Sequence, residues 1–414
     1  MTRILQSLST FILLVFASLP VFSQWTQRQT LTGLPRTFAT NFTVNNTIYV
    51  IGGFDANSTL FNDVWAYDPV TDTWTQKANF PGGNRSASTA FTIGSKAYMG
   101  TGSDGNNYLH DFWEYEPLTD TWTQKADFPG FEREEAVSFS IGGKGYLGTG
   151  QTFVVTPNSS FTTTYNDFFE YDPSTDSWTP KDSLPGPPRA YAVGAVIGNK
   201  GYLGLGGNND QTLSYTDFYE YDPVTDTWTA KASMGGSGRA DAGAVASGNN
   251  IYVVGGINFP NFNGFSSCRK YDATTDTWVN GPNFNGGVII APVIQNVNGR
   301  VFAGTGYNSS LTPRNDWWEF TSLTASIETV EMQQSLVFPN PFSTELILDL
   351  KNTRGGLQIE LVDAQGKLVY YERETTNELE KIKVDTKNFS SGIYLLRISN
   401  SSGKVVELRK LIKS

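Results

Sequence analysis

The chain has 414 residues, which is long enough for one large domain and one small one. Its formal net charge is −10 at pH 7, and from residue 325 onward 12 Lys and Arg stand against 12 Asp and Glu, so the acidity lies earlier in the chain. An acidic region without a cluster of Lys or Arg is a poor partner for a phosphate backbone, so nucleic acid is excluded as the expected ligand.

The N-terminus has the pattern of a secretory signal. Residues 1–23 combine Arg3, an apolar run at 11–17 and small residues before Gln24. This pattern predicts a cleavable signal peptide. No later stretch approaches the roughly 20 apolar residues that a membrane-spanning helix needs, so we expect no membrane span.

From Trp25 to about residue 322 the chain is a tandem repeat. The phrase Tyr-Asp-Pro-Val-Thr-Asp-Thr-Trp at 67–74 returns with small changes, ending at Trp122, Trp178, Trp228 and Trp278. Asp-Pro opens a turn, and the aromatic and β-branched flanks predict a hairpin between two strands. The copies are 48 to 50 residues apart, except for one spacing of 56, so each copy is one structural unit.

Fixed spacings continue inside each copy. The hairpin Trp is followed 11 residues later by Arg, the Arg 13 residues later by Tyr, and the Tyr 4 residues later by Gly, although the sixth copy has Ile289 in place of Arg. Each copy holds four strand patterns, as at 192–197, 251–254 and 217–221. A lone four-stranded sheet of this size cannot cover both of its faces, so the copies are expected to pack in a ring.

The ends of the repeat predict how the ring closes. Residues 25–28 match the last strand of a copy, whereas the sixth copy ends at 317–320 without a last strand of its own. The N-terminal strand is therefore expected to complete the sixth blade, which removes an open sheet edge. Cys268, the single cysteine, allows no internal disulfide and falls at a strand position that is apolar in other copies, so we expect it to be buried.

These marks resemble kelch repeats. The resemblance rests on aromatic-x-x-x-Gly, Tyr-Asp-Pro-x-Thr-Asp-x-Trp and the Arg that follows, and it covers about residues 24–322. It implies an all-β fold with a six-bladed kelch-type β-propeller, of the superfamily that includes the propeller of galactose oxidase.

The pattern changes after a polar linker at 323–336. Residues 337–414 carry short alternating strands with turn signals between them, which predict a small immunoglobulin-like β-sandwich. Asn-Pro-Phe, Asp-Ala-Gln-Gly-Lys, Ser-Gly-Ile-Tyr-Leu and a final strand ending in Lys resemble the C-terminal sorting domain of the Bacteroidetes type IX secretion system. The resemblance implies contact with that machinery and export to the outside or the outer-membrane surface. The alternative is an ordinary immunoglobulin-like domain.

One face of the predicted propeller carries the variable loops, and a fixed scaffold with one variable face indicates binding there. A ring of arginines is expected around the channel mouth as an anchor for a carboxylate or sulfate. Its members are Arg36, Arg85, Arg133, Arg189 and Arg239. The structural alternative is that each Arg bonds neighbouring backbone or the Asp of an adjacent blade.

Residues that break the repeat after these arginines are the candidates for chemistry. Glu134 and Glu135 follow Arg133, and Asp241 follows Arg239; a carboxyl group near an Arg could act as a general acid or base. Tyr191, Tyr108, Phe161 and Phe262 are candidate ligand contacts, since exposed aromatic residues on polar loops suit sugar faces or protein hot spots. The extra segment around 153–165 is expected to overhang the channel mouth.

The chain offers little for metal chemistry. Kelch relatives include a copper radical oxidase acting on galactose and a sialic acid mutarotase, and the oxidase resemblance would need two His, two Tyr and a cross-linking Cys. His110 is the single histidine, so neither a copper nor a His-based zinc site is expected, and no cofactor. The prediction is a secreted or cell-surface module that binds a glycan or an extracellular protein. The alternative is a metal-free sugar epimerase, mutarotase or lyase at the channel mouth.

Overall fold

The structure is a computed structural model that describes residues 25–156, 159–321, 336–349, 357–363, 368–374, 381–400 and 405–414. The expected signal peptide and most of the expected linker lie outside these residues. The chain divides between Leu323 and Thr324 into two compact units, each described by itself below. The described residues form strands and loops, and no helix occurs among them.

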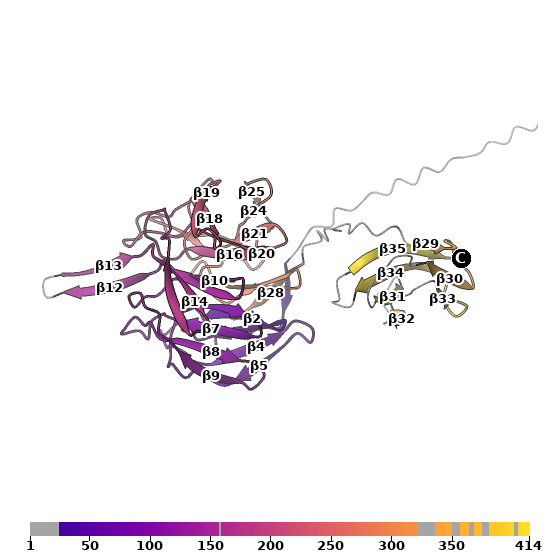
Figure 1. Ribbon diagram of the computed structural model, residues 1–414, viewed down its shortest axis with the longest axis horizontal. Helices are drawn as coiled ribbons and strands as arrows, with labels where there is room; N and C mark the ends of the chain where they lie inside the picture. Colours follow the sequence, from indigo (N-terminus) through magenta and orange to yellow (C-terminus); the bar gives the residue numbers. More distant parts are fainter. Residues whose placement is uncertain are drawn as a thin grey trace, which may run out of the picture. The chain divides into compact units, whose positions relative to one another are not determined.

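The first unit contains six four-stranded antiparallel sheets (Figure 1). Blade 1 is β2 (Thr40–Val44), β3 (Thr47–Ile51), β4 (Val64–Asp68) and β5 (Thr73–Lys77). Blade 2 is β6 (Thr89–Ile93), β7 (Lys96–Gly100), β8 (Phe112–Glu116) and β9 (Thr121–Lys125). Blade 3 is β10 (Val137–Ile141), β11 (Lys144–Gly148), β14 (Phe168–Asp172) and β15 (Ser177–Lys181).

Blade 4 is β16 (Val193–Ile197), β17 (Lys200–Gly204), β18 (Phe218–Asp222) and β19 (Thr227–Lys231). Blade 5 is β20 (Gly243–Ser247), β21 (Asn250–Val254), β24 (Cys268–Asp272) and β25 (Thr277–Asn280). Blade 6 is β26 (Val293–Val297), β27 (Arg300–Gly304), β28 (Trp317–Thr321) and β1 (Trp25–Arg28). Two small hairpins lie outside the blades, β12 (Gln151–Thr156) with β13 (Ser159–Thr164) and β22 (Ile257–Asn258) with β23 (Asn263–Gly264).

The ring closes as the sequence predicts. Strand β1 pairs with β28, so that Trp25 lies opposite Phe320 and Arg28 opposite Trp317. The innermost strands β2, β6, β10, β16, β20 and β26 contact one another in that order, and β26 contacts β2. The first and last strands of the repeat therefore share one sheet, and the all-β fold with six blades is confirmed.

The repeated Tyr-Asp-Pro phrase clamps each blade to the one before it. In blade 1 the Asp72 carboxylate accepts hydrogen bonds from the Tyr67 hydroxyl at 2.7 Å and from the Gln29 backbone N–H at 2.9 Å. The Trp74 indole N–H donates to the Gln29 carbonyl at 2.8 Å. The same indole bond recurs at Trp122, Trp178, Trp228 and Trp278. The phrase thus makes the hairpin, and also satisfies backbone groups of the neighbouring blade that no sheet pairs.

Blade 6 has no such phrase, and the junction between blades 5 and 6 uses Trp25 instead. The Trp25 indole N–H donates to the Pro282 carbonyl at 3.4 Å, and its ring packs edge-on against Phe284 with ring centroids 5.0 Å apart. Cys268 is buried in the same core cluster as Trp25, as the sequence predicts.

The second unit has two sheets around one core. The first is β29 (Leu336–Phe338), β30 (Glu345–Asp349) and β33 (Ile382–Asp385); the second is β32 (Leu368–Glu374), β31 (Leu357–Asp363), β34 (Gly392–Asn400) and β35 (Val405–Lys413). Leu346 and Val384 of the first sheet and Leu361 and Leu396 of the second lie fully buried in one hydrophobic cluster. The described residues of this unit therefore form a small two-sheet sandwich.

Candidate functional site

Six equivalent residues form a ring around the channel; five lie two positions after the repeated Arg, and the sixth lies two positions after Ile289. They are Phe38, Ala87, Glu135, Tyr191, Asp241 and Ala291. All six have φ between 49° and 60°, a left-handed conformation that is uncommon for residues other than Gly. The N–H of Ala87 donates to the Phe38 carbonyl, and that of Glu135 to the Ala87 carbonyl, at 2.9 and 3.0 Å. All six blades share this backbone conformation although the side chains differ. A change of side chain at a ring position therefore changes the lining of the channel and leaves the backbone as it is.

The repeated arginines lie in the wall of the propeller, not on its open mouth. Arg133 is fully buried; its guanidinium forms two bonds of 2.5 and 2.8 Å with the Asp167 carboxylate and donates to the Thr149 carbonyl at 2.8 Å. Arg36, Arg85 and Arg189 make the same bonds with Asp63, Asp111 and Asp217. These guanidiniums are engaged with protein groups, as the structural alternative expects, but the Asp comes from the same blade and not from an adjacent one. The Asp that precedes the third strand of each of these blades is thus the partner of the repeated Arg.

Two blades depart from this pattern. Arg239 in blade 5 has Ser267 in place of Asp, and donates to the Ser267 hydroxyl and carbonyl at 2.6 and 2.7 Å. Burial lowers the pKa of Arg239 to about 10. In blade 6 Arg314 fills the gap left by Ile289, since its guanidinium pairs with Asp316 and donates to the Val288 carbonyl at 2.8 Å. The Arg-x-Asp spacing at 314–316 was a signal for this substitution that sequence reasoning missed.

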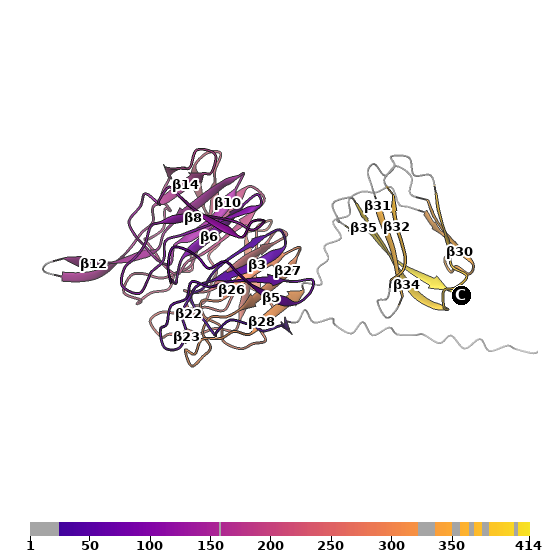
Figure 2. The ribbon, with the colours of Figure 1, turned by 90° about the horizontal axis from the view of Figure 1, so that it is seen from below.

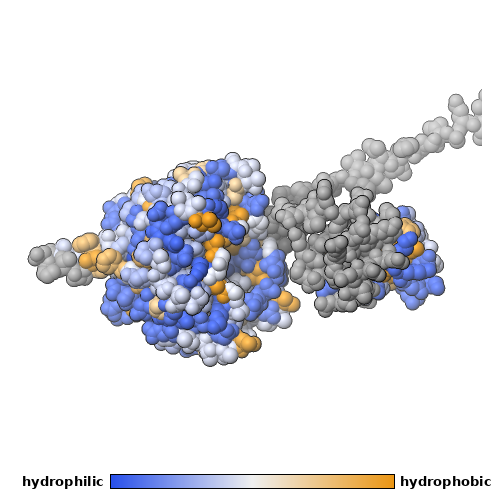
Figure 3. All heavy atoms as spheres, viewed as in Figure 1, coloured by the Kyte–Doolittle hydropathy of each residue, from blue (hydrophilic) through white to orange (hydrophobic). Residues whose placement is uncertain are grey.

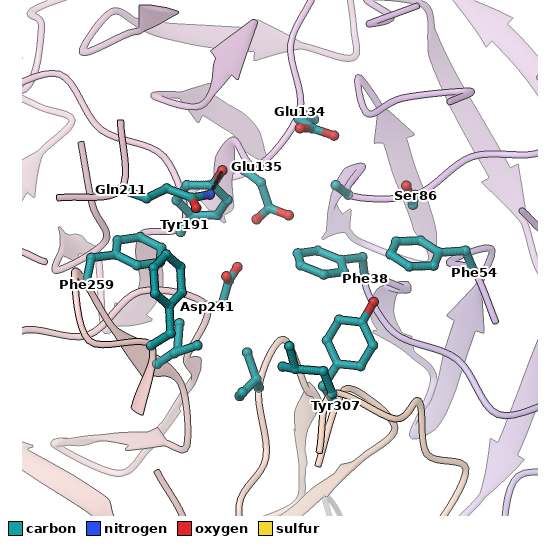
Figure 4. A pocket seen from close by; sticks show the side chains of 15 residues that line it. Phe38, Phe54, Ser86, Glu134, Glu135, Tyr191, Gln211, Asp241, Phe259 and Tyr307 are labelled. Carbon is teal, nitrogen blue, oxygen red and sulfur yellow. Dashed lines mark hydrogen bonds between the residues drawn. The ribbon is translucent and has the colours of Figure 1, made fainter. Parts of the chain in front are cut away.

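A pocket of about 320 Å³ opens at the channel mouth (Figure 4). We call it the channel-mouth pocket. Its lining residues are Phe38, Phe54, Ser86, Ala87, Glu134, Glu135, Tyr191, Gln211, Asp241, Ile257, Phe259, Phe262, Ile290, Tyr307 and Leu311. The structure thus brings together five of the sequence candidates, the four at positions that break the repeat and Phe262, and adds Phe38, Phe54 and Tyr307, which were not singled out.

Two of its carboxyl groups, Glu135 and Asp241, point into the open centre of the pocket in Figure 4. Burial raises the pKa of both groups, and the negative charge of Asp241 raises that of Glu135 further. Burial also raises the pKa of Glu134, while hydrogen bonds from Gln151 and Tyr108 oppose the shift. The pocket therefore favours the protonated form of its acids, because a carboxylate there loses hydration and faces like charge.

A polar network holds one side of the pocket. The Gln151 amide N–H donates to Glu134 at 3.2 Å and to the Tyr191 hydroxyl at 2.5 Å, and the Gln211 amide N–H donates to the same hydroxyl at 3.0 Å. Tyr191 is buried, and the Tyr108 hydroxyl interacts with the Glu134 carboxyl group. These contacts fix the directions of Glu134 and Tyr191, and neither Gln151 nor Gln211 was found by sequence reasoning.

Two aromatic clusters face each other across the pocket (Figure 4). On one side Phe38 stacks on Phe54 with ring centroids 5.7 Å apart, and Tyr307 packs edge-on against Phe38 at 6.1 Å. On the other side Phe259 packs against Tyr191 at 5.8 Å and against Phe262 at 5.3 Å. Counting two residues beyond Arg36 would have found Phe38, whereas Tyr307 joins the site only through the fold.

The expectation that residues 153–165 overhang the channel mouth is wrong. Strands β12 and β13 form a hairpin that projects away from the six sheets (Figures 1 and 2), and none of the described residues between 153 and 165 lines the pocket. Phe153 and Phe161 on this hairpin are 47% and 48% exposed, and hydrophobic residues stand out along it in Figure 3. The hairpin points outward because the β12–β13 pairing runs the length of the insertion and makes it a ribbon of its own.

Metal ligands do not gather in the part of the chain that the structure describes. No group of three or more His, Cys, Asp or Glu side chains there could hold a metal ion. The buried Cys268 thiol has its pKa raised by burial to about 12, which disfavours the thiolate that binds metals.

Comparison with known proteins agrees with this architecture. A family model described as Attractin/LZTR1 beta-propeller matches residues 21–265, and one described as Secretion system C-terminal sorting domain matches residues 336–414. A solved structure titled "Structure of YjhT" is 20% identical with a TM-score of 0.58, over 69% of this chain and 95% of that one, which shows similarity of fold. A search of curated proteins found no match.

Fold, site and matches together define a kelch-type β-propeller that carries a C-terminal sorting domain for type IX secretion. Within that class, the chain belongs to the Attractin/LZTR1 beta-propeller family. Its sorting domain indicates engagement with the secretion machinery and export to the outside or to the outer-membrane surface. Within the described residues there is no helix that is long and apolar enough to cross a membrane.

Proposed function

We propose that this secreted or cell-surface propeller is a binding module whose channel-mouth pocket takes part of a glycan or of an extracellular protein. The observation that carries the proposal is the pair of aromatic clusters facing each other across a pocket of about 320 Å³. Ligand sites of this kind are concave and mostly apolar, with a few polar groups that orient the ligand. Ser86, Gln211 and the carboxyl groups supply those polar contacts here.

The scaffold supports this role because it presents the pocket rigidly. Each ring residue takes part in a backbone hydrogen bond of the channel, and the Trp and Asp of the repeated phrase tie each of blades 1 to 5 to the blade before it, while Trp25 ties blade 6 to blade 5. A preformed site loses little conformational entropy when a ligand binds. Sequence variation at the ring residues and in the outer loops can then set the ligand without changing the fold.

A screen of the full chain on glycan arrays and against extracellular protein extracts tests the proposal. Each hit is measured again with Tyr307→Ala, for which we expect binding at least about tenfold weaker, since aromatic anchors dominate recognition. Phe161→Ser is the matched control, because it removes an exposed aromatic residue outside the pocket. Hits that bind Tyr307→Ala as tightly as the unchanged chain would reject the pocket as the site.

The second candidate is a metal-free sugar epimerase, mutarotase or lyase. The observation that favours it is the pair Glu135 and Asp241, which both point into the pocket and whose pKa values are raised by burial, as for the acid and base groups of many active sites. Against it, the repeated arginines that would anchor an anionic substrate are engaged in the wall. Anomer exchange of any sugar hit, followed by NMR, separates the two functions: acceleration that disappears in Glu135→Gln supports the enzyme, and binding without acceleration supports the module.

A further inference from the structure

The channel-mouth pocket is lined by acidic side chains and by no basic ones. Glu134, Glu135 and Asp241 line it, and the 15 lining residues, all of them described, include no Lys, Arg or His. The nearest repeated arginine in sequence, Arg133, is fully buried and holds Asp167. A negatively charged ligand would therefore find no cation among the lining residues, and any of the three acids that is ionised would repel it.

Glu135 and Asp241 have no hydrogen-bond or ion-pair partner among the described side chains, whereas Glu134 accepts from Gln151 at 3.2 Å. The other titratable groups that face the pair are Glu134 and Tyr191, and neither supplies positive charge. Because the two acids are buried close to each other and to Glu134, burial and like charge raise the pKa of both. A cation placed between Glu135 and Asp241 would neutralise the negative charge of their carboxylates, for which the described side chains provide no positive partner.

The aromatic clusters indicate which kind of cation fits. Phe38, Phe54 and Tyr307 on one side and Tyr191 and Phe259 on the other present ring surfaces and few oxygen atoms. A small metal ion prefers a shell of oxygen ligands. An organic cation instead gains from ring faces by cation–π attraction while its carbon chain packs on apolar walls.

The propeller as a whole is complementary to a basic partner. Between residues 24 and 322 there are 28 Asp and Glu against 17 Lys and Arg, and five of those arginines are buried in the wall. Such a surface attracts positively charged partners over long range and raises their rate of association. An amino sugar also carries an ammonium group, but its several hydroxyls would find few acceptors or donors on these mostly apolar walls.

We propose that the channel-mouth pocket receives a basic side chain, Lys or Arg, presented by a protein partner, with its charge between Glu135 and Asp241 and its carbon chain between the aromatic clusters. The inference rests on the proposed function, because it names the ligand group that the binding module recognises. It selects a protein over a glycan, and a cation over a neutral or anionic group.

The test is ligand-observed NMR on the full chain with blocked amino acids as probes. Nα-acetyl-lysine methylamide and Nα-acetyl-arginine methylamide are each compared with a neutral counterpart, the Nε-acetylated lysine and the citrulline compound. We expect the basic probes to bind at least about tenfold more tightly than their counterparts, and to lose that advantage in Glu135→Gln/Asp241→Asn. Glu132→Gln is the control, since Glu132 is exposed, lies in the same loop and does not line the pocket.

The double variant is expected to fold, because it removes two carboxyl groups that burial and like charge disfavour. The inference is overturned if the neutral counterparts bind equally well, if the double variant binds the basic probes unchanged, or if glucosamine binds and the basic amino acids do not. If a neutral glycan or peptide from the screen binds and is lost in Tyr307→Ala while the basic probes do not bind, the inference fails and the proposed function stands. If no ligand of any kind depends on the pocket, both fail.

Discussion

Two neighbouring positions of the repeat, with one residue between them, have opposite physical roles. Arg133 is fully buried, paired with Asp167 and repeated in kind around the ring. Glu135 faces the channel, has no partner among the described side chains, and stands where other blades place Phe, Ala, Tyr or Asp. The comparison teaches that regularity in a propeller marks the residues that hold it together, whereas the variable neighbour on the same loop lines the channel-mouth pocket.

The largest expected effect is the loss of stability when the buried ion pair between Arg133 and Asp167 is removed. Arg133→Ala leaves the Asp167 carboxylate and the Thr149 carbonyl without their donor, so we expect a loss of about 3–5 kcal/mol in the free energy of unfolding. Urea denaturation of the full chain, followed by tryptophan fluorescence, measures it. Glu132→Gln on the same loop should stay within about 0.5 kcal/mol of the unchanged chain. Equal stabilities of Arg133→Ala and Glu132→Gln would contradict the structural role of the arginine.

A second change, at the channel, should have the opposite sign. The unfolded chain loses the Asp241 proton near pH 4, whereas the folded chain keeps it until about pH 8, so stability falls as pH rises through this window. Glu135→Gln/Asp241→Asn removes that loss, and we expect a gain of about 2 kcal/mol or more at pH 8 and little change at pH 4. Thermal unfolding between pH 4 and pH 9 checks it; a double variant whose stability keeps the original pH dependence would show that other groups cause it.

Blade 5 is the exception among the buried arginines, because Arg239 faces Ser267 where blades 1 to 4 have an Asp. Ser267→Asp should supply Arg239 with the carboxylate that blades 1 to 4 provide, and we expect a gain of about 1–2 kcal/mol. A double-mutant cycle with Arg239→Ala measures the coupling between the two side chains. A coupling energy near zero would mean that the backbone and hydroxyl bonds of Ser267 already satisfy the guanidinium.

The smallest expected effect concerns the projecting hairpin. Phe161→Ser should change the free energy of unfolding by less than about 0.5 kcal/mol, because the ring is 48% exposed and lies outside the buried clusters. It should also leave binding at the channel-mouth pocket unchanged. Denaturation and the ligand screen test both points, and a loss of binding here would give the hairpin a share of the recognition surface.

Much of the fold follows from local chemistry that the sequence displays. Asp-Pro turns, aromatic strands and the spacing from Trp to Arg to Tyr to Gly predict the blades, because each depends on residues close together in the chain. Even the closure through residues 25–28 could be inferred, since a strand motif without its sheet needs a partner. The site was half predictable: Glu134, Glu135, Tyr191 and Asp241 break the repeat and do meet at the channel.

The sequence by itself therefore determined the repeat, the ring and the residues that depart from the repeat. It also showed that residues 337–414 resemble a sorting domain. Only the tertiary structure decided that four of the repeated arginines face Asp carboxylates of their own blades inside the wall, that Tyr307 joins the acids in one pocket, and that the hairpin stands clear of the channel. The reason is physical: periodicity encodes which residues are equivalent, but side-chain direction depends on backbone conformation and on neighbours from distant blades. Charge pairing across 34 residues of chain, as from Arg133 to Asp167, becomes visible only when the sheet is formed.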